Sequence, residues 1–284
     1  SLMLFEAILV EFQICSFIVV NSEKISKIKM YRKYRRKEII MLELRGIHWK
    51  TPENEEIVKG IDLVIPKGEL TVITGPNGGG KTSLAKIIAG LYTPSEGQIL
   101  LNKEDITHWD ITKRARGGIA YAFQQPVRFK GLSVRDLLEL SAGETLEEAR
   151  LCTMLSTVGL CAQEYMDRQV DASLSGGEGK RIEIATVLFR KDAQVLVFDE
   201  PEAGIDLWSF TNLIDAFESL KKEGGRTLVI ISHQERIMEI ADHIAVVADG
   251  TVRSFGKRDE ILPSLLAGER CALCPIGDSG KEAC

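Results

Sequence analysis

The sequence is poor in cysteine, in net positive charge and in uninterrupted apolar runs, and each shortage excludes a class of protein. Six cysteines lie among 284 residues without a regular framework, which argues against a disulfide-stabilised fold and favours reduced thiols in a cytoplasmic protein. The net charge is −5, and because residues 1–40 carry +4, residues 41–284 carry −9. An acidic body argues against a nucleic-acid partner, which would require a basic face.

One apolar stretch approaches the length of a membrane span, and it lies at the start of the chain. Residues 2–20 are largely apolar but are interrupted by Glu6, Glu11 and Gln13, and an acid at bilayer depth costs about 2.5 kcal/mol or more. The basic charges follow this stretch, whereas a signal peptide places them before it. We expect residues 1–40 to be an extension outside the fold; a membrane anchor, a docked amphipathic helix and an added strand are the alternatives.

The segment at 75–82 is unusually rich in glycine and reads Gly-Pro-Asn-Gly-Gly-Gly-Lys-Thr. It is a complete phosphate-binding loop, preceded by an apolar, strand-like run at 70–74 and followed by a helical run at 81–89. Glycines let the backbone wrap around a phosphate, and the helix presents its positive end to the same anion. We expect the nucleotide to be held by Gly75, Pro76, Asn77, Gly78, Gly79, Gly80, Lys81, Thr82 and Ser83.

Three further strand-like apolar runs are each followed closely by polar residues: 118–121, 195–198 and 228–231. The carboxyl ends of parallel strands form the ligand-binding edge of an open α/β sheet. Gln124 after the first run and Asp199 at the end of the second offer oxygen ligands for Mg²⁺, together with the Thr82 hydroxyl. Glu200 follows Asp199 directly, and we expect it to act as the general base on an attacking water.

The pentapeptide Leu-Ser-Gly-Gly-Glu at 174–178 precedes a helical stretch and exposes backbone N–H groups that suit an anion. In order and spacing, all these motifs together resemble those of the ATP-binding cassette (ABC) ATPases, from about Met41 to about Leu262. The resemblance implies an α/β P-loop NTPase fold with three parts: a RecA-like core, an antiparallel β subdomain near 42–66 and 96–102, and a helical signature lobe at about 126–180.

The resemblance also implies roles in a site that two subunits share. Residues 174–178 match the ABC signature, in which Ser175 and Gly177 contact the γ-phosphate bound by the other subunit. Residues 203–206 match the D-loop, which crosses the dimer interface, and His233 matches the switch histidine that links the γ-phosphate to Glu200. The nucleotide-binding residues therefore extend to Ser175, Gly176, Gly177, Glu178 and Asp206, and the catalytic residues are Glu200, His233 and Gln124. One phosphate loop and one signature per chain imply a dimer.

The choice among ABC ATPases has a first expectation and an alternative. Residues 122–127, 174–181 and 232–237 are similar to the Q-loop, signature and switch regions of SufC, the ATPase of iron–sulfur cluster assembly, which docks on a soluble SufB/SufD-like scaffold. Pro201 and the segment 128–134 instead resemble transporter cassettes. The alternative is therefore the nucleotide-binding subunit of a membrane transporter, in which a permease helix docks beside the Q-loop. Chromosome-maintenance ATPases are excluded, because no sustained heptads separate phosphate loop and signature.

Two features are left open by the sequence. Trp49 is the nearest aromatic residue that could stack on adenine, but it could equally pack within the β subdomain. The ABC domain is placed at 41–265, and a tail at 266–284 contains Cys271, Cys274 and Cys284. A closed zinc site or an iron–sulfur cluster usually needs four ligands, so we expect the tail to be free and reduced.

Overall fold

A computed structural model describes residues 40–272 of the chain. The chain divides between Ile40 and Met41 into two units, and the description below concerns the second unit. The predictions for residues 1–39, Cys274 and Cys284 lie outside the described residues, and of Cys271 only the backbone is described.

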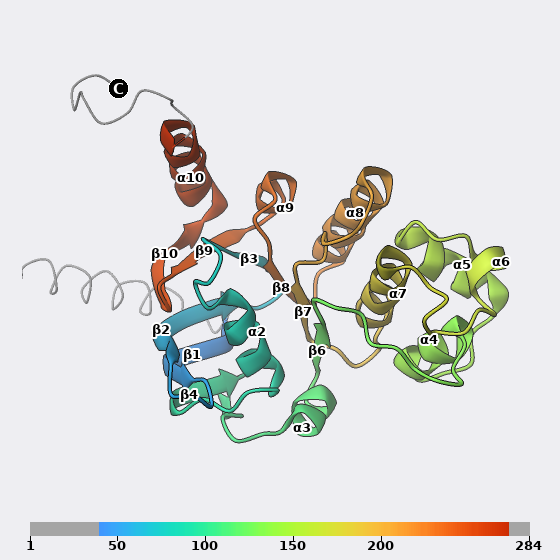
Figure 1. The fold of residues 1–284 in the computed structure, drawn as a ribbon, viewed down its shortest axis with the longest axis horizontal. Coiled ribbons are helices and arrows are strands. Elements are labelled where there is room, and N and C mark those ends of the chain that lie inside the picture. The colour runs from blue at the N-terminus through green and yellow to red at the C-terminus, as the bar shows by residue number, and fades with distance from the viewer. Residues whose placement is uncertain (1–39, 273–284) are drawn as a thin grey trace, which may run out of the picture. The chain divides into compact units, whose positions relative to one another are not determined.

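A six-stranded sheet with the strand order β10–β9–β3–β8–β7–β6 forms the centre of this unit (Figure 1). Strand β10 is antiparallel to β9, and the other neighbours are parallel. The six strands are β3 (Leu70–Thr74), β6 (Ile119–Ala122), β7 (Val195–Asp199), β8 (Thr227–Ile231), β9 (His243–Ala248) and β10 (Thr251–Lys257).

A second sheet, in the order β2–β1–β4–β5, has antiparallel pairing between β1 and β4 and between β4 and β5. Its strands are β1 (Ile40–Lys50), β2 (Glu56–Pro66), β4 (Glu96–Leu101) and β5 (Glu104–Asp105). This sheet is the predicted antiparallel β subdomain. The strands predicted from the apolar runs at 70–74, 118–121, 195–198 and 228–231 are also confirmed, within a residue or two at their ends.

Nine helices lie within residues 40–272, and none of them is long and apolar enough to span a membrane. They are α2 (Lys81–Ala89), α3 (Ile111–Arg116), α4 (Val134–Ala142), α5 (Glu148–Thr157), α6 (Ala162–Tyr165), α7 (Gly176–Leu188), α8 (Leu207–Glu223), α9 (Glu235–Glu239) and α10 (Arg258–Ala272). Helices α4 to α6 lie at one end of the molecule, beyond α7 (Figure 1), and form the predicted helical lobe.

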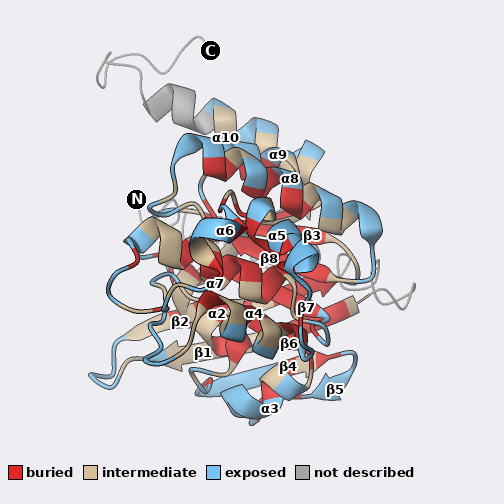
Figure 2. Ribbon diagram, turned by 90° about the vertical axis from the view of Figure 1, so that its right-hand side faces the viewer, coloured by how far each residue is buried: buried red, intermediate tan, exposed pale blue. Residues whose placement is uncertain are grey.

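The central strands are almost entirely buried, and most of their residues are apolar, because both of their faces are covered (Figure 2). Along β7, Val195 and Val197 face the core that contains α2 and the second sheet. Leu196 and Phe198 face the other core, which contains α7 and α8. Successive side chains of a strand point to opposite faces, so a continuous apolar run is the expected pattern for a strand between two layers.

A buried arginine fixes the helix that follows the phosphate loop. The Arg114 guanidinium on α3 donates to Ile87 O and Ile88 O, at the carboxyl end of α2, at 2.5 Å and 2.9 Å. It also donates to Trp109 O and Thr107 O, both at 3.0 Å. Helix ends leave carbonyls without partners, and a cation there also complements the helix dipole. The arginine therefore holds α2 in a fixed position from its far end.

A buried carboxyl connects the signature helix to the strand edge. Glu183 on α7 accepts a hydrogen bond from the Phe123 N–H, directly after β6, at 2.7 Å. Burial raises the pKa of Glu183 to about 7, although the Phe123 hydrogen bond and the Lys180 charge both act to lower it. Among the described residues, Glu183 Oε2 has no hydrogen-bond partner. Near neutral pH, this carboxyl therefore binds a proton that it would release in the unfolded chain.

This proton makes stability depend on pH. The pKa rises on folding from an ordinary value of 4.5 to about 7, so Glu183 reduces the free energy of unfolding as pH rises through that range, by about 3 kcal/mol in total. Glu183→Gln retains an acceptor for Phe123 and should lack this loss. Urea unfolding at about pH 5 and about pH 8 measures the free energy of unfolding of both proteins. The difference between variant and parent protein should shift in favour of the variant at the higher pH. Glu164→Gln, at an exposed position, is the control. An equal change in the pH dependence of the free energy of unfolding in both variants would contradict the assignment to Glu183.

Candidate functional site

The glycine-rich loop lies between β3 and α2, as predicted, and the backbone needs glycine at several of its positions. Gly75 has φ 133°, and a Cβ on it would lie 2.1 Å from the Val247 oxygen. Gly80, the residue before α2, has φ 94°. The buried Lys81 ammonium donates to Gly75 O at 2.8 Å and to Pro76 O at 2.9 Å, so the lysine holds the loop closed around its own head group.

A fully buried carboxylate at the end of β7 joins three elements. Asp199 Oδ1 accepts from the Thr82 hydroxyl at 3.2 Å, and Asp199 Oδ2 accepts from the Tyr121 hydroxyl at 3.0 Å. Burial raises the pKa of Asp199, whereas the hydrogen bonds from Tyr121 and Thr82 lower it. Burial also lowers the pKa of Lys81, against the opposing charges of Glu200 and Asp199. Tyr121 was not predicted as a site residue.

The glutamine after β6 reaches the carboxylate that directly follows β7. Gln124 Nε2 donates to Glu200 Oε2 at 2.8 Å. Glu200 has φ 47°, a left-handed conformation that is uncommon for a residue with a side chain. Its own N–H donates to Ile231 O, on β8, at 3.0 Å. Two residues predicted to be catalytic from separate motifs are therefore in direct contact.

A lysine that follows the signature donates hydrogen bonds to the backbone of both segments that carry this contact. Lys180 on α7 is almost fully buried, and its ammonium donates to Phe123 O, to Gln124 O at 3.2 Å and to Asp199 O at 3.2 Å. Burial lowers the pKa of Lys180, whereas the charges of Glu183 and Asp199 raise it. The sequence shows a basic pair at 180–181, but nothing in it shows that one member turns inward.

The switch histidine lies beside a carboxylate that the motifs did not single out. His233 Nδ1 is 4.0 Å from Glu202 Oε1, and its side chain is largely exposed. The Ser232 hydroxyl donates to the same Glu202 oxygen at 2.6 Å. Burial raises the pKa of Glu202, and the hydrogen bond from Ser232 lowers it. The histidine is therefore placed next to Glu202, and its predicted link to Glu200 stays a prediction.

The signature and the D-loop form one surface, and the phosphate loop lies elsewhere. Ser175 caps α7 in a capping box with Glu178. A Cβ on Gly177 would lie 2.6 Å from Gly204 O, so the two loops touch. Among residues 40–272, no hydrogen bond joins 75–82 to 174–178, and α2 and α7 lie apart in Figure 1. One chain therefore does not bring its own signature to its phosphate loop.

Trp49 packs within the β subdomain. Its ring stacks on that of Tyr92 with the centroids 4.3 Å apart and the planes 4° from parallel. The Lys86 ammonium lies 5.3 Å from the centre of the Tyr92 ring. Of the two roles left open for Trp49, the structure therefore shows the packing role.

The donor atoms at the strand edge fit a magnesium ion. Mg²⁺ prefers oxygen ligands and is usually held by one or two carboxylates together with phosphate oxygens. Thr82 and Asp199 already place two oxygens side by side, and the amide oxygen of Gln124 lies at the same edge. The described residues contain no group of three or more His, Cys, Asp or Glu side chains that could hold a metal without a substrate.

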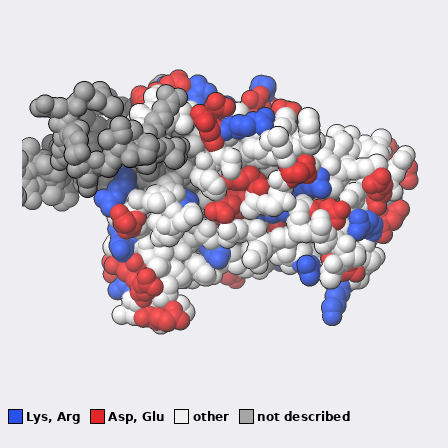
Figure 3. Space-filling model, turned by 45° about the horizontal axis from the view of Figure 1, so that its top comes forward, with Lys and Arg blue, Asp and Glu red and all other residues white. Residues whose placement is uncertain are grey.

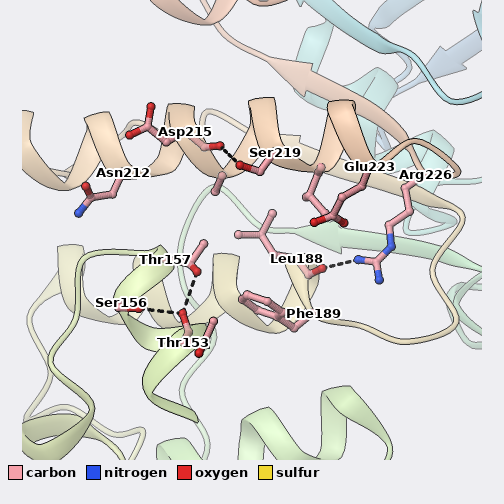
Figure 4. A pocket seen from close by; sticks show the side chains of 12 residues that line it. Thr153, Ser156, Thr157, Leu188, Phe189, Asn212, Asp215, Ser219, Glu223 and Arg226 are labelled. Atoms are coloured by element: carbon pink, nitrogen blue, oxygen red, sulfur yellow. Dashed lines mark hydrogen bonds between the residues drawn. The ribbon is translucent and has the colours of Figure 1, made fainter. Parts of the chain in front are cut away.

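A hollow of about 440 Å³ lies between α5, the end of α7 and α8 (Figure 4), and none of its lining residues belongs to the predicted site. Several of its hydroxyls turn back to carbonyls of their own helices: Thr153, Ser156, Thr157 and Ser219. It lies where the helical lobe meets α8, away from the nucleotide-binding motifs.

Charges of both signs are interspersed on the face drawn in Figure 3. That face therefore carries no large field of one sign, and the electrostatics that matter for a bound anion are local. They come from Lys81, the N-terminal end of α2 and the backbone N–H groups of the glycine loop.

Comparison with known proteins identifies the family. The ABC transporter family model matches residues 58–203. An uncharacterized ABC transporter ATP-binding protein of Methanocaldococcus jannaschii is 37% identical over 231 residues, covering 78% of this chain and 91% of that protein. The sulfate/thiosulfate import ATP-binding protein CysA of Synechocystis sp. is 35% identical over 212 residues, covering 72% of this chain but 57% of its own length.

A solved structure supports the fold. The dimeric structure of a bacterial ABC transporter cassette superposes with a TM-score of 0.68 at 23% identity, covering 77% of this chain and 99% of that one. The predicted α/β P-loop NTPase fold is confirmed. With this fold, the family match and the strand edge described above, the chain belongs to the ABC transporter family and is an ATPase.

Proposed function

We propose that residues 41–265 form the ATP-hydrolysing unit and that two copies enclose ATP between the phosphate loop of one and the signature of the other. One observation carries the proposal: Gln124, Glu200, Asp199 and Thr82 converge through hydrogen bonds at the strand edge beside the glycine loop. The separation of signature and phosphate loop within one chain supports the need for a second copy.

In this mechanism Lys81 leaves the loop carbonyls and binds the β- and γ-phosphates, which offer it a stronger charge-assisted hydrogen bond. The Glu200 carboxylate accepts a proton from water as the water oxygen attacks the γ-phosphorus and the bond to ADP breaks. Gln124 orients Glu200 and the water, and His233 donates to the γ-phosphate. Ser175 and Gly177 of the second copy bind that phosphate from the opposite side.

Thr82, Asp199 and Gln124 are the residues that would hold Mg²⁺, which neutralises charge on the β- and γ-phosphates when bound. Asp199 is suited to this task because its position is fixed from both sides by Thr82 and Tyr121. The raised pKa of Asp199 reflects the burial of its charge, and a cation would offset that cost.

The partner that uses the ATP is most simply a transporter subunit in a membrane, with this chain on the cytoplasmic side. The two curated relatives described above carry names of ABC transporter ATP-binding proteins, and CysA is named an import protein. The SufC-like expectation therefore gives way to its alternative as the main proposal. The permease would dock beside Gln124, where Val127 and Phe129 expose apolar surface.

A SufC-like ATPase acting on a soluble scaffold stays a second candidate because the basic pair Lys180 and Arg181 resembles the SufC signature region. The basic pair after the signature is the feature that resembles SufC, and its first member holds both the Q-loop backbone and the end of β7. This connection couples the helix that carries the signature to the loop on which a partner would dock. It is compatible with either kind of partner, so it does not outweigh the names of the relatives.

Co-purification separates the two partners. The full chain, isolated from its native cells in mild detergent, should bring with it a membrane-embedded subunit. The same purification without detergent serves as the control and should lose that subunit. A soluble β-helical scaffold that co-purifies under both conditions would overturn the transporter proposal and establish the second candidate.

Removing the lysine of the loop should abolish nucleotide binding. Lys81→Ala removes the cation that faces the phosphates, and we expect ATP affinity to fall by about a hundredfold or more, since charge-assisted hydrogen bonds contribute about 1.5–3 kcal/mol each. Isothermal titration with ATP and Mg²⁺ measures the change. Lys86→Ala, on the same helix, is the control, and unchanged affinity in Lys81→Ala would contradict the assigned role.

Replacing the general base should separate binding from turnover. Glu200→Gln keeps an acceptor for the Gln124 amide but cannot take a proton, so hydrolysis should fall by about a hundredfold or more. ATP should still bind and should hold two copies together, which light scattering after gel filtration detects as a doubled mass. Parent-like turnover in this variant would show that another group is the base.

A further inference from the structure

Two adjacent apolar side chains are exposed to solvent at the start of α8. Trp208 is 82% exposed, more than any other large apolar side chain in the described residues, and Leu207 beside it is 68% exposed. Single exposed apolar residues are ordinary on protein surfaces. An adjacent pair that includes tryptophan is different, because tryptophan is the residue most enriched at the centres of interfaces.

The pair is held in place by the cap of α8. Asp206 Oδ1 accepts from the Ser209 N–H at 3.0 Å, and Asp206 Oδ2 accepts from the Ser209 hydroxyl at 2.7 Å. Leu207 and Trp208 are the first two residues of the helix that this cap starts. Their backbone is therefore fixed before any partner arrives, which lowers the entropy cost of burying them.

The same cap is tied to the signature helix. The Arg181 guanidinium, on α7, donates to the Ser209 hydroxyl at 2.7 Å and to Gly159 O at 3.0 Å. It also lies 3.9 Å from Asp206 Oδ2. The cap from which the apolar pair starts is thus hydrogen-bonded to the signature helix.

The surface around the pair is continuous with the two motifs that face the second copy in the proposed function. Gly177 and Gly204 are in contact, and the D-loop leads directly into Leu207. The exposed residues of this surface are Ser175, Gly176, Ala203, Gly204, Asp206, Leu207 and Trp208. Polar and small residues surround one apolar pair on this surface. Protein–protein interfaces have the same arrangement, an apolar centre within a polar rim.

We propose that Leu207 and Trp208 form an apolar contact of the ATP-driven interface between two copies of this chain. The inference rests on the proposed function and adds to it a contact that touches neither nucleotide nor catalytic residue. A second copy is the occupant because the pair directly continues the D-loop. The exposed surface near Gln124, where a permease or a scaffold would dock, belongs to a different loop.

The test uses the Glu200→Gln chain, in which ATP holds two copies together. Adding Trp208→Ala should raise the protein concentration at which half of the chains are dimeric by about tenfold or more, since truncation of an interface tryptophan commonly costs over 1 kcal/mol. Leu207→Ala should act in the same direction. Leu140→Ala is the matched control, because Leu140 is also 68% exposed but lies on α4 in the helical lobe. Analytical ultracentrifugation with ATP and Mg²⁺ gives the dimerisation constants.

The outcomes distinguish this inference from the function on which it rests. If Glu200→Gln itself fails to dimerise with ATP, the proposed function fails. If it dimerises and Trp208→Ala leaves the constant unchanged, this inference is overturned. ATP affinity measured well below the dimerising concentration should be the same with and without Trp208→Ala; a loss there would mean that the residue acts on the nucleotide site and would also overturn the inference.

Fluorescence gives a second readout that a merely structural role would not move. The emission of Trp208 is obtained by subtracting the signal of Glu200→Gln/Trp208→Phe from that of Glu200→Gln. ATP should shift this emission to shorter wavelength and protect it from acrylamide, because the ring leaves water. Quenching of Trp208 that stays the same in the ATP-bound dimer would contradict its burial between two copies.

Discussion

The arrangement of the site depends on one buried carboxylate. Asp199 ends a strand that has neighbours on both sides, and it accepts hydrogen bonds from Thr82 of the phosphate loop and Tyr121 of β6. Its backbone carbonyl accepts from Lys180 of the signature helix. Burying a carboxylate costs free energy unless it is hydrogen-bonded, and here the groups that stabilise it come from three different elements. Its burial therefore positions the loop, the strand edge and the signature helix relative to one another.

In the proposed function, the same fold leaves the site of one chain incomplete. Lys180, Glu183 and Gln124 bind the Q-loop to the strand edge, whereas Gly177 of the signature contacts Gly204 of the D-loop. Arg181 extends that second group to the start of α8. In the proposed function, the first group of residues holds the nucleotide of its own chain, and the second meets the nucleotide of another copy. In that proposal ATP joins the two copies as well as serving as the substrate.

Much of this could be predicted from the sequence, because the signals are local. Glycines that need positive φ, and a run of four apolar residues that a carboxylate pair follows, specify β3, α2 and β7 without knowledge of the rest. Lys180, Glu202 and Tyr121 were not predicted as site residues, because their roles depend on which way a side chain turns once α7, β6 and β8 are packed. Trp49 packs on Tyr92, which follows α2 and is far from Trp49 in the chain. The partner is the least predictable feature, since short exposed motifs resemble two kinds of ABC ATPase.

In the proposed function, one copy of the chain does not contain a complete hydrolytic site. The most direct test is the ATPase rate per chain, measured over a wide range of protein concentrations at saturating ATP and Mg²⁺. A site that two copies share predicts a rate per chain that rises with concentration and then levels off as dimers form. A rate per chain that is the same at every concentration, down to those at which the protein sediments as a monomer, would contradict the account.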